Sequence, residues 1–157
     1  MPSAPAQRPE SPAVPPLRAR PRRRPAPTAD ASRPARTGPG VALPALARQD
    51  VEGGWAYRFV EVRVDDRVAS VLLKGPDAPP SRSAETWIFQ AFRELEDALL
   101  RLRFNHLEVG LINLRTQGDM GEVLAHEEAL LSGAKSDWFL YEVQNFVART
   151  LRTAALK

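Results

Sequence analysis

Residues 109–114, VGLINL, decide the fold of this chain, because they form a short and almost unbroken apolar run. Such a run is typical of a parallel strand inside a sheet, covered on both of its faces. We therefore expect an interior strand here. The segments on either side determine how the chain enters and leaves this strand.

Two strands are predicted before this run. Residues 57–64 alternate and place Val60, Val62 and Val64 on one face, which indicates a half-buried strand. A tight turn then leads into a returning strand over residues 67–74.

A long helix is predicted between the returning strand and the apolar run. Ser83 is its expected N-cap, and residues 105–106 end it. One continuous apolar face runs along it, formed by Ile88, Phe92, Leu95, Leu99 and Leu102. Because this helix joins two strands of one sheet, the strands are expected to be parallel, with a right-handed crossover.

Two further helices are predicted after the apolar run. Residues 116–119 turn the chain at the carboxyl end of that strand, where open α/β sheets usually bind ligands. A short helix over residues 120–131 is expected to bury Leu124 and Leu131, and Ser136 or Asp137 is expected to cap a final helix. The fold class is therefore α/β, with the order strand, strand, helix, strand, helix, helix.

The composition of the chain changes near residue 50. Residues 1–50 hold 12 of the 15 prolines and no aromatic residue, with nine arginines against three acidic residues. Such a segment buries too little apolar surface to offset its ordering entropy. We expect a disordered, polyproline-rich tail over residues 1–50 and one folded domain over residues 51–157.

The basic run at residues 18–24 could attract nucleic acid or an acidic membrane surface. It contains no aromatic residue that would stack on a base, so a solvated tail is the favoured interpretation and nucleic-acid binding is not expected. The sequence contains no apolar run of membrane-spanning length and no cysteine. We expect a cytoplasmic protein without membrane partners.

No residue of the sequence is assigned a catalytic, cofactor-binding or metal-binding role. His106 and His126 lack ligands at metal-site spacing, so each is interpreted as a surface or capping histidine. Glu127 and Glu128 are consecutive on a helix and diverge by about 100°, so they are not expected to face one substrate together. Gly118, which comes directly after a strand, is a weak candidate for a ligand-binding loop.

Several segments together resemble the second half of the benzoyl-CoA-dihydrodiol lyases, members of the crotonase (enoyl-CoA hydratase/isomerase) superfamily. The segments are residues 40–43, 57–62, 95–103, 116–119, 137–139 and 148–153. The resemblance covers roughly residues 40–157 and implies a partial crotonase-type fold. It also implies a carbon–carbon lyase that opens the dihydrodiol ring of a benzoyl-CoA derivative to a semialdehyde acyl-CoA and formate, during aerobic benzoate degradation.

The resemblance further implies that the substrate is a coenzyme A thioester and that no metal or redox cofactor takes part. Relatives stabilise the thioester oxyanion with two backbone N–H groups, one of them from a Ser-Ala-Gly-Ala-Asp-like turn. Residues 116–120 hold Thr-Gln-Gly-Asp-Met at that place, so the pattern is missing. We expect a truncated or split gene product that is inactive alone, with a missing lyase half or a second copy as its partner. The alternative is a non-catalytic oligomerisation or interaction module whose basic tail binds a polyanion.

Overall fold

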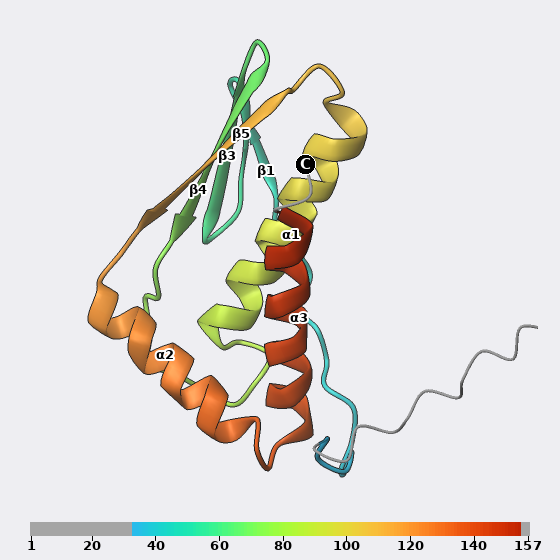
Figure 1. Ribbon diagram of the computed structural model, residues 1–157, viewed down its shortest axis with the longest axis vertical. Helices are drawn as coiled ribbons and strands as arrows, with labels where there is room; N and C mark the ends of the chain where they lie inside the picture. The colour runs from blue at the N-terminus through green and yellow to red at the C-terminus, as the bar shows by residue number, and fades with distance from the viewer. Residues whose placement is uncertain (1–32, 155–157) are drawn as a thin grey trace, which may run out of the picture.

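The structure, a computed structural model, describes residues 33–154, which fold into a five-stranded sheet and three helices (Figure 1). The elements in chain order are β1 Gln49–Val51, β2 Gly54–Ala56, β3 Val60–Asp65, β4 Val68–Lys74, α1 Trp87–Asn105, β5 Leu111–Gln117, α2 Met120–Gly133 and α3 Trp138–Ala154. The α/β class is confirmed, and so is the predicted order from β3 to α3. Of the predicted tail over residues 1–50, residues 1–32 lie outside the described residues.

The strands lie in the sheet in their chain order. The first four are joined by antiparallel pairings, whereas β4 and β5 are parallel, as the predicted crossover requires. The register places Val62 beside Val71 and Val71 beside Leu114. The helix-facing side of the sheet therefore carries an almost purely apolar surface, because period-two alternation places these residues on one face.

The apolar run is not an interior strand, contrary to our expectation. β5 is the edge of the sheet, and Leu111 and Leu114 expose 60% and 45% of their surface. The cause is the position of α1, whose backbone lies close to β3 and β4 but not to β5. Leu114 therefore faces the helical side of the sheet with no described helix over it.

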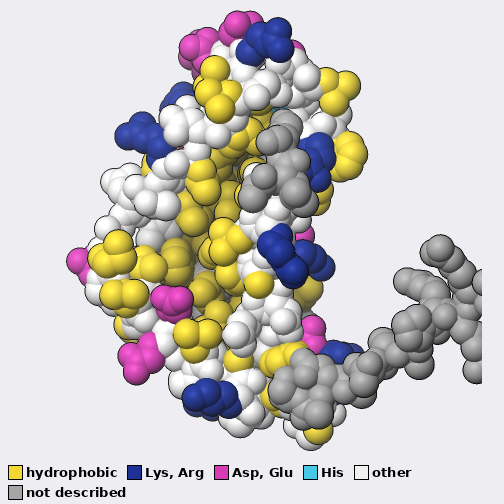
Figure 2. Space-filling view, viewed as in Figure 1, with side chains coloured by type: hydrophobic (Ala, Val, Ile, Leu, Met, Phe, Trp, Pro, Cys, Tyr) yellow, Lys and Arg dark blue, Asp and Glu magenta, His cyan; other side chains and the backbone are white. Residues whose placement is uncertain are grey.

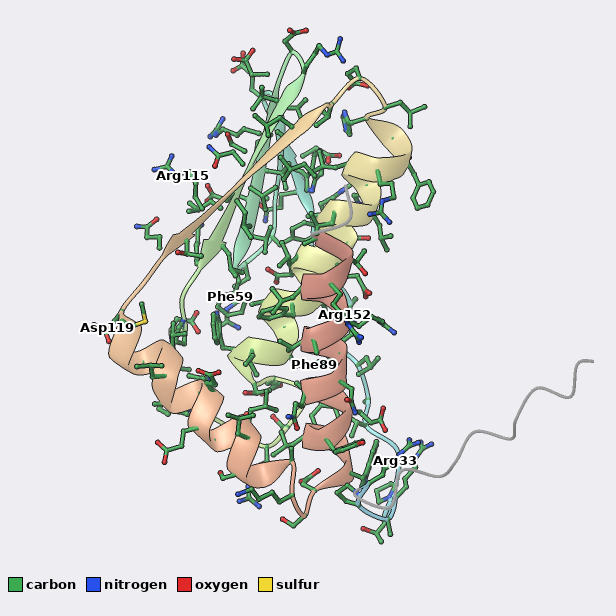
Figure 3. The ribbon with its side chains drawn as sticks, in the orientation of Figure 1. Arg33, Phe59, Phe89, Arg115, Asp119 and Arg152 are labelled. Carbon is green, nitrogen blue, oxygen red and sulfur yellow. The ribbon has the colours of Figure 1, made fainter. Side chains whose placement is uncertain are left out.

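The core lies between the sheet and α1, and the predicted apolar face of this helix is confirmed. Ile88, Phe92, Leu95, Leu99 and Leu102 are all buried, with Leu95 and Leu102 almost fully so. On its other side α1 packs against α3, with the edges of Phe139 and Phe146 on Phe89 (Figure 3).

The start of α1 differs from the prediction. The helix begins at Trp87 with Thr86 as its N-cap, not at Ser83. The Ser83 hydroxyl accepts a hydrogen bond from the backbone N–H of Glu85, and the Ser83 carbonyl accepts one from the N–H of Thr86. Ser83 thus closes a separate turn before the helix, as serine side chains commonly do.

The orientation of α2 also differs from the prediction. Leu124 and Leu131 expose 53% and 46% of their surface, whereas His126 and Leu130 are buried. The helix presents the His126 side to α1, since the His126 ring meets the edge of the Trp87 ring. The expectation of a surface or capping position for His126 is therefore wrong.

Residues 33–48 have no helix or strand, yet they contact the helices. The carbonyl oxygens of Pro44 and Thr37 accept hydrogen bonds from Arg93 of α1 and from the Trp138 indole of α3. Arg33 also forms an ion pair with Glu142 of α3. The part of the chain with defined structure therefore begins before residue 51.

Candidate functional site

A groove of about 540 Å³ opens between the carboxyl ends of β4 and β5 and the three helices. Figure 2 shows it as a hollow floored by hydrophobic side chains. Its lining is mainly apolar, with contributions from Leu73, Trp87, Ile88, Phe92, Val123, Leu130, Val147 and Leu151. Clefts of this size and character are typical of small-molecule sites.

Polar side chains join this lining at a few points. Thr116 and Gln117 are the last residues of β5 and Asp119 follows it, whereas Glu127 and Gln144 come from α2 and α3. The sequence predicted a turn over residues 116–119, but β5 continues to Gln117, so the chain turns only at Gly118 and Asp119. All four residues line the groove. Glu127 lines the groove without Glu128, which agrees with the expected divergence of the two carboxylates.

Gly75 and Gly118 hold the two strand ends together beside the groove. The backbone N–H of Gly75 donates to the Gln117 carbonyl oxygen at 2.6 Å. A Cβ atom on Gly118 would lie only 2.8 Å from the Cα of Gly75. The glycine that the sequence offered as a ligand-loop candidate is therefore required for the close approach of two backbones.

Asp119 caps α2 at the groove (Figure 3). Its Oδ1 accepts a hydrogen bond from the backbone N–H of Glu122 at 2.9 Å. Its negative charge also lies at the positive end of the helix dipole. The side chain therefore fixes the direction in which α2 leaves β5.

The substitution Asp119→Ala is expected to lower the free energy of unfolding by about 1 kcal/mol, because it removes this cap. Urea denaturation followed by circular dichroism measures the change. Asp119→Asn is the matched control, since its amide oxygen can still accept the bond and its loss should be smaller. Equal losses for the two variants would show that the side-chain oxygen does not cap the helix.

The two histidines lie in separate environments. His126 Nε2 is 2.9 Å from the Ala78 carbonyl oxygen and must donate to it, while its buried Nδ1 has no hydrogen-bond partner among residues 33–154. His106 ends α1, stacks on Trp55, and has its Nδ1 3.1 Å from a Glu108 carboxylate oxygen. His106 is the C-cap of α1, which agrees with its interpretation as a surface or capping histidine.

The two histidines lie at opposite ends of α1, whose 19 residues span roughly 28 Å, since the Trp87 ring that contacts His126 is at the start of the helix and His106 is at its end. They therefore cannot share a site. Within residues 33–154, no group of three His, Cys, Asp or Glu side chains is placed to hold a metal ion.

A charged cluster ties α1 to the start of β3, away from the groove. Asp97 accepts hydrogen bonds from the Tyr57 hydroxyl and, at 2.7 Å, from Arg101. Burial and the Asp97 carboxylate raise the pKa of Tyr57. Burial also acts to raise the pKa of Asp97, but the hydrogen bonds from Tyr57 and Arg101 outweigh it and hold that pKa below its usual value. The cluster stabilises the fold.

Each helix within residues 33–154 is too short or too polar to cross a bilayer. No protein-family model matches the chain.

The chain is similar to the benzoyl-CoA-dihydrodiol lyase of Aromatoleum evansii, with 36% identity over 122 residues. The aligned segment covers 71% of this chain and 22% of that enzyme, so the chain spans about a fifth of the length of the curated relative it matches. This comparison confirms the inferred resemblance to benzoyl-CoA-dihydrodiol lyase.

Proposed function

We propose that this chain is part of a carbon–carbon lyase of the crotonase superfamily that acts on an aromatic-derived coenzyme A thioester in the cytoplasm. The reaction opens the dihydrodiol ring of a benzoyl-CoA derivative to a semialdehyde acyl-CoA and formate. The observation that carries this proposal is the 36% identity over 122 residues to a benzoyl-CoA-dihydrodiol lyase.

The groove supports a role in holding the acyl part of such a substrate. A ring derived from benzoate is apolar over most of its surface, and the groove offers aromatic and aliphatic side chains from all three helices. Thr116 and Gln117 add hydrogen-bonding groups at the strand ends. A mainly apolar cleft with a few polar groups is suited to orienting a small ligand.

We also propose that the chain does not catalyse the reaction alone. Its aligned segment corresponds to 22% of the relative, so most of that enzyme has no counterpart in the alignment. The turn at residues 116–120 lacks the expected oxyanion pattern. Stabilisation of the developing oxyanion is usually the largest single contribution to such catalysis, so a chain without this element is expected to bind without turnover.

The purified chain is expected to bind benzoyl-CoA but to release no formate from its dihydrodiol. Because Trp87 lines the groove, binding should change tryptophan fluorescence. Trp87→Phe should remove that change while leaving binding measurable by calorimetry. Val147→Arg, which introduces a charge into the groove, should weaken binding at least about tenfold.

Leu43→Arg is the matched control, since Leu43 is exposed and lies outside the groove lining. A full-length homologous lyase is the positive control for formate release. Formate produced by the chain alone would overturn the proposed inactivity and direct mutagenesis to residues 116–120. Absence of benzoyl-CoA binding would overturn the proposed role of the groove.

An alternative function, a non-catalytic interaction module, is favoured by the exposed apolar side chains of β5 and of the helices around the groove. The proposed polyanion-binding run at residues 18–24 lies outside the described residues. Deletion of residues 1–32, which leaves the described part of the chain intact, should abolish a salt-sensitive affinity for nucleic acid if that run binds a polyanion.

A further inference from the structure

The edge of β5 offers an unused row of backbone hydrogen-bonding groups. The Leu111 N–H and the Gln117 carbonyl point toward β4 and its flanking residues, since their partners are Arg67 and Gly75. Backbone groups along a strand alternate in direction. The N–H and C=O groups of Ile112, Leu114 and Thr116 therefore point outward, where the described chain has no further strand.

This edge has little of the usual protection against pairing. β5 contains no proline and one charged residue, Arg115, which points away from the helices (Figure 3). Natural sheets normally protect a long edge with charges, prolines, bulges or a covering element. Among the described elements β5 contacts β4 alone, whereas the opposite edge, β1, is only three residues long.

We propose that two copies of this chain associate through β5, paired antiparallel about a two-fold axis at Leu114, so that their sheets join into one. This register is self-complementary. Leu114 lies opposite its own copy, and Ile112 lies opposite Thr116, so all the outward-pointing N–H and C=O groups of these residues find partners. The same register sets Arg115 opposite Asn113, which avoids like charges across the strands.

The position of the groove supports a second copy of this chain as the partner of β5. A two-fold axis perpendicular to the sheet keeps both sets of helices on the same side of the joined sheet. The groove and β5 open toward the same side of the molecule (Figures 1 and 2). The two grooves therefore face each other across the axis, and Leu114, with 45% of its surface exposed, becomes covered by its own copy.

The residues beside the two ends of β5 are also apolar at both ends. Antiparallel pairing brings the end of one β5, where α2 begins, beside the start of the other. Met120 lies just after the first of these ends and exposes 70% of its surface, while Leu107 precedes the second and exposes 82%. The pairing therefore places apolar side chains against apolar side chains, which is typical of the core of a homodimer interface.

A charge-exchange experiment on the full chain tests this arrangement. The unmodified chain is expected to be dimeric by light scattering coupled to size exclusion. Leu114→Glu and Leu114→Lys should each be monomeric, because like charges would face each other at the axis. An equimolar mixture of the two variants should recover a heterodimer, since the axis then pairs opposite charges.

Leu100→Glu is the matched control, because Leu100 of α1 exposes 39% of its surface and lies outside β5 and the groove lining. It should remain dimeric. Circular dichroism of the monomeric variants should retain the unmodified spectrum, and recovery in the mixture excludes misfolding as the cause. A monomeric unmodified chain, or single variants that remain dimeric, would overturn the proposal. This inference does not depend on the proposed lyase function.

Discussion

Replacing Gly54 by Ala is expected to lower the free energy of unfolding by at least about 3 kcal/mol, a large part of the stability of an ordinary domain. A Cβ atom at this position would overlap the Val62 carbonyl oxygen and lie 2.9 Å from the Val62 carbonyl carbon. These atoms are backbone and cannot rotate away. β2 would therefore separate from β3, and Trp55, which pairs with Val62, would lose its buried position.

Gly53 provides the adjacent control. Its φ of +73° disfavours a side chain, but a Cβ atom there would meet nothing within 4 Å. Gly53→Ala should therefore cost about 1–2 kcal/mol through backbone strain alone. Urea denaturation of both variants, with Trp55 as a fluorescent reporter, measures the difference. Equal losses would show that the approach of β2 to β3 is not the reason for Gly54.

The position of β5 shows which part of the fold the sequence could not reveal. Residues 109–114 are apolar enough for an interior strand, and the parallel pairing with β4 expected from the crossover is present. The apolar composition of a strand indicates that its burial is favourable. It does not indicate which element, or which chain, covers the strand. The sequence therefore predicted the presence and direction of this strand correctly. It predicted incorrectly that the strand lies in the interior of the sheet.

Short or ambiguous patterns account for the other differences. β1 and β2 have three residues each, too few for alternation to be visible. On α2 the sequence pattern predicted that Leu124 and Leu131 form the buried side. In the structure the buried side carries His126, which contacts Trp87, and both leucines are exposed. A histidine can be buried when a carbonyl accepts its N–H, and that partner, Ala78, is 48 residues away.

The candidate site was only partly visible in the sequence. Residues 116–119 were predicted as a turn at the carboxyl end of a strand; they line the groove, although Thr116 and Gln117 still belong to β5. The groove itself could not be predicted, because three helices form its walls. The angles at which these helices pack cannot be inferred from local sequence patterns. Gly75 was also missed, since its close approach to Gly118 appears only when the two strand ends are side by side.

The second large effect is expected at Glu94, a carboxylate of α1 that is only 5% exposed. It accepts a hydrogen bond from the backbone N–H of Phe59 at 2.7 Å and so ties α1 to the entry of β3. Glu94→Ala leaves that buried N–H without an acceptor and opens a cavity. We expect a loss of about 3 kcal/mol in the free energy of unfolding.

Glu94→Gln should cost less, about 1 kcal/mol, because its amide oxygen can still accept the Phe59 N–H. Urea denaturation near neutral pH measures both losses. Phe59 lies between the sheet and α1, so the entry of β3 should loosen in the Ala variant, and hydrogen exchange of the Phe59 amide should report it (Figure 3). A Gln variant as unstable as the Ala variant would show that the acceptor oxygen contributes little.

The pH dependence of these losses separates the charge of Glu94 from its hydrogen bond. Burial raises the pKa of Glu94 in the folded state, although backbone N–H groups partly oppose the shift. Its ionised form is therefore less favourable in the folded than in the unfolded chain, where the pKa is about 4.3. The stability contributed by this group is present below that value and falls as the pH rises through the folded pKa. Measured by urea denaturation from about pH 4 to pH 7, the deficit of Glu94→Gln relative to the unmodified chain should shrink with rising pH, and a deficit that grows would contradict the raised pKa.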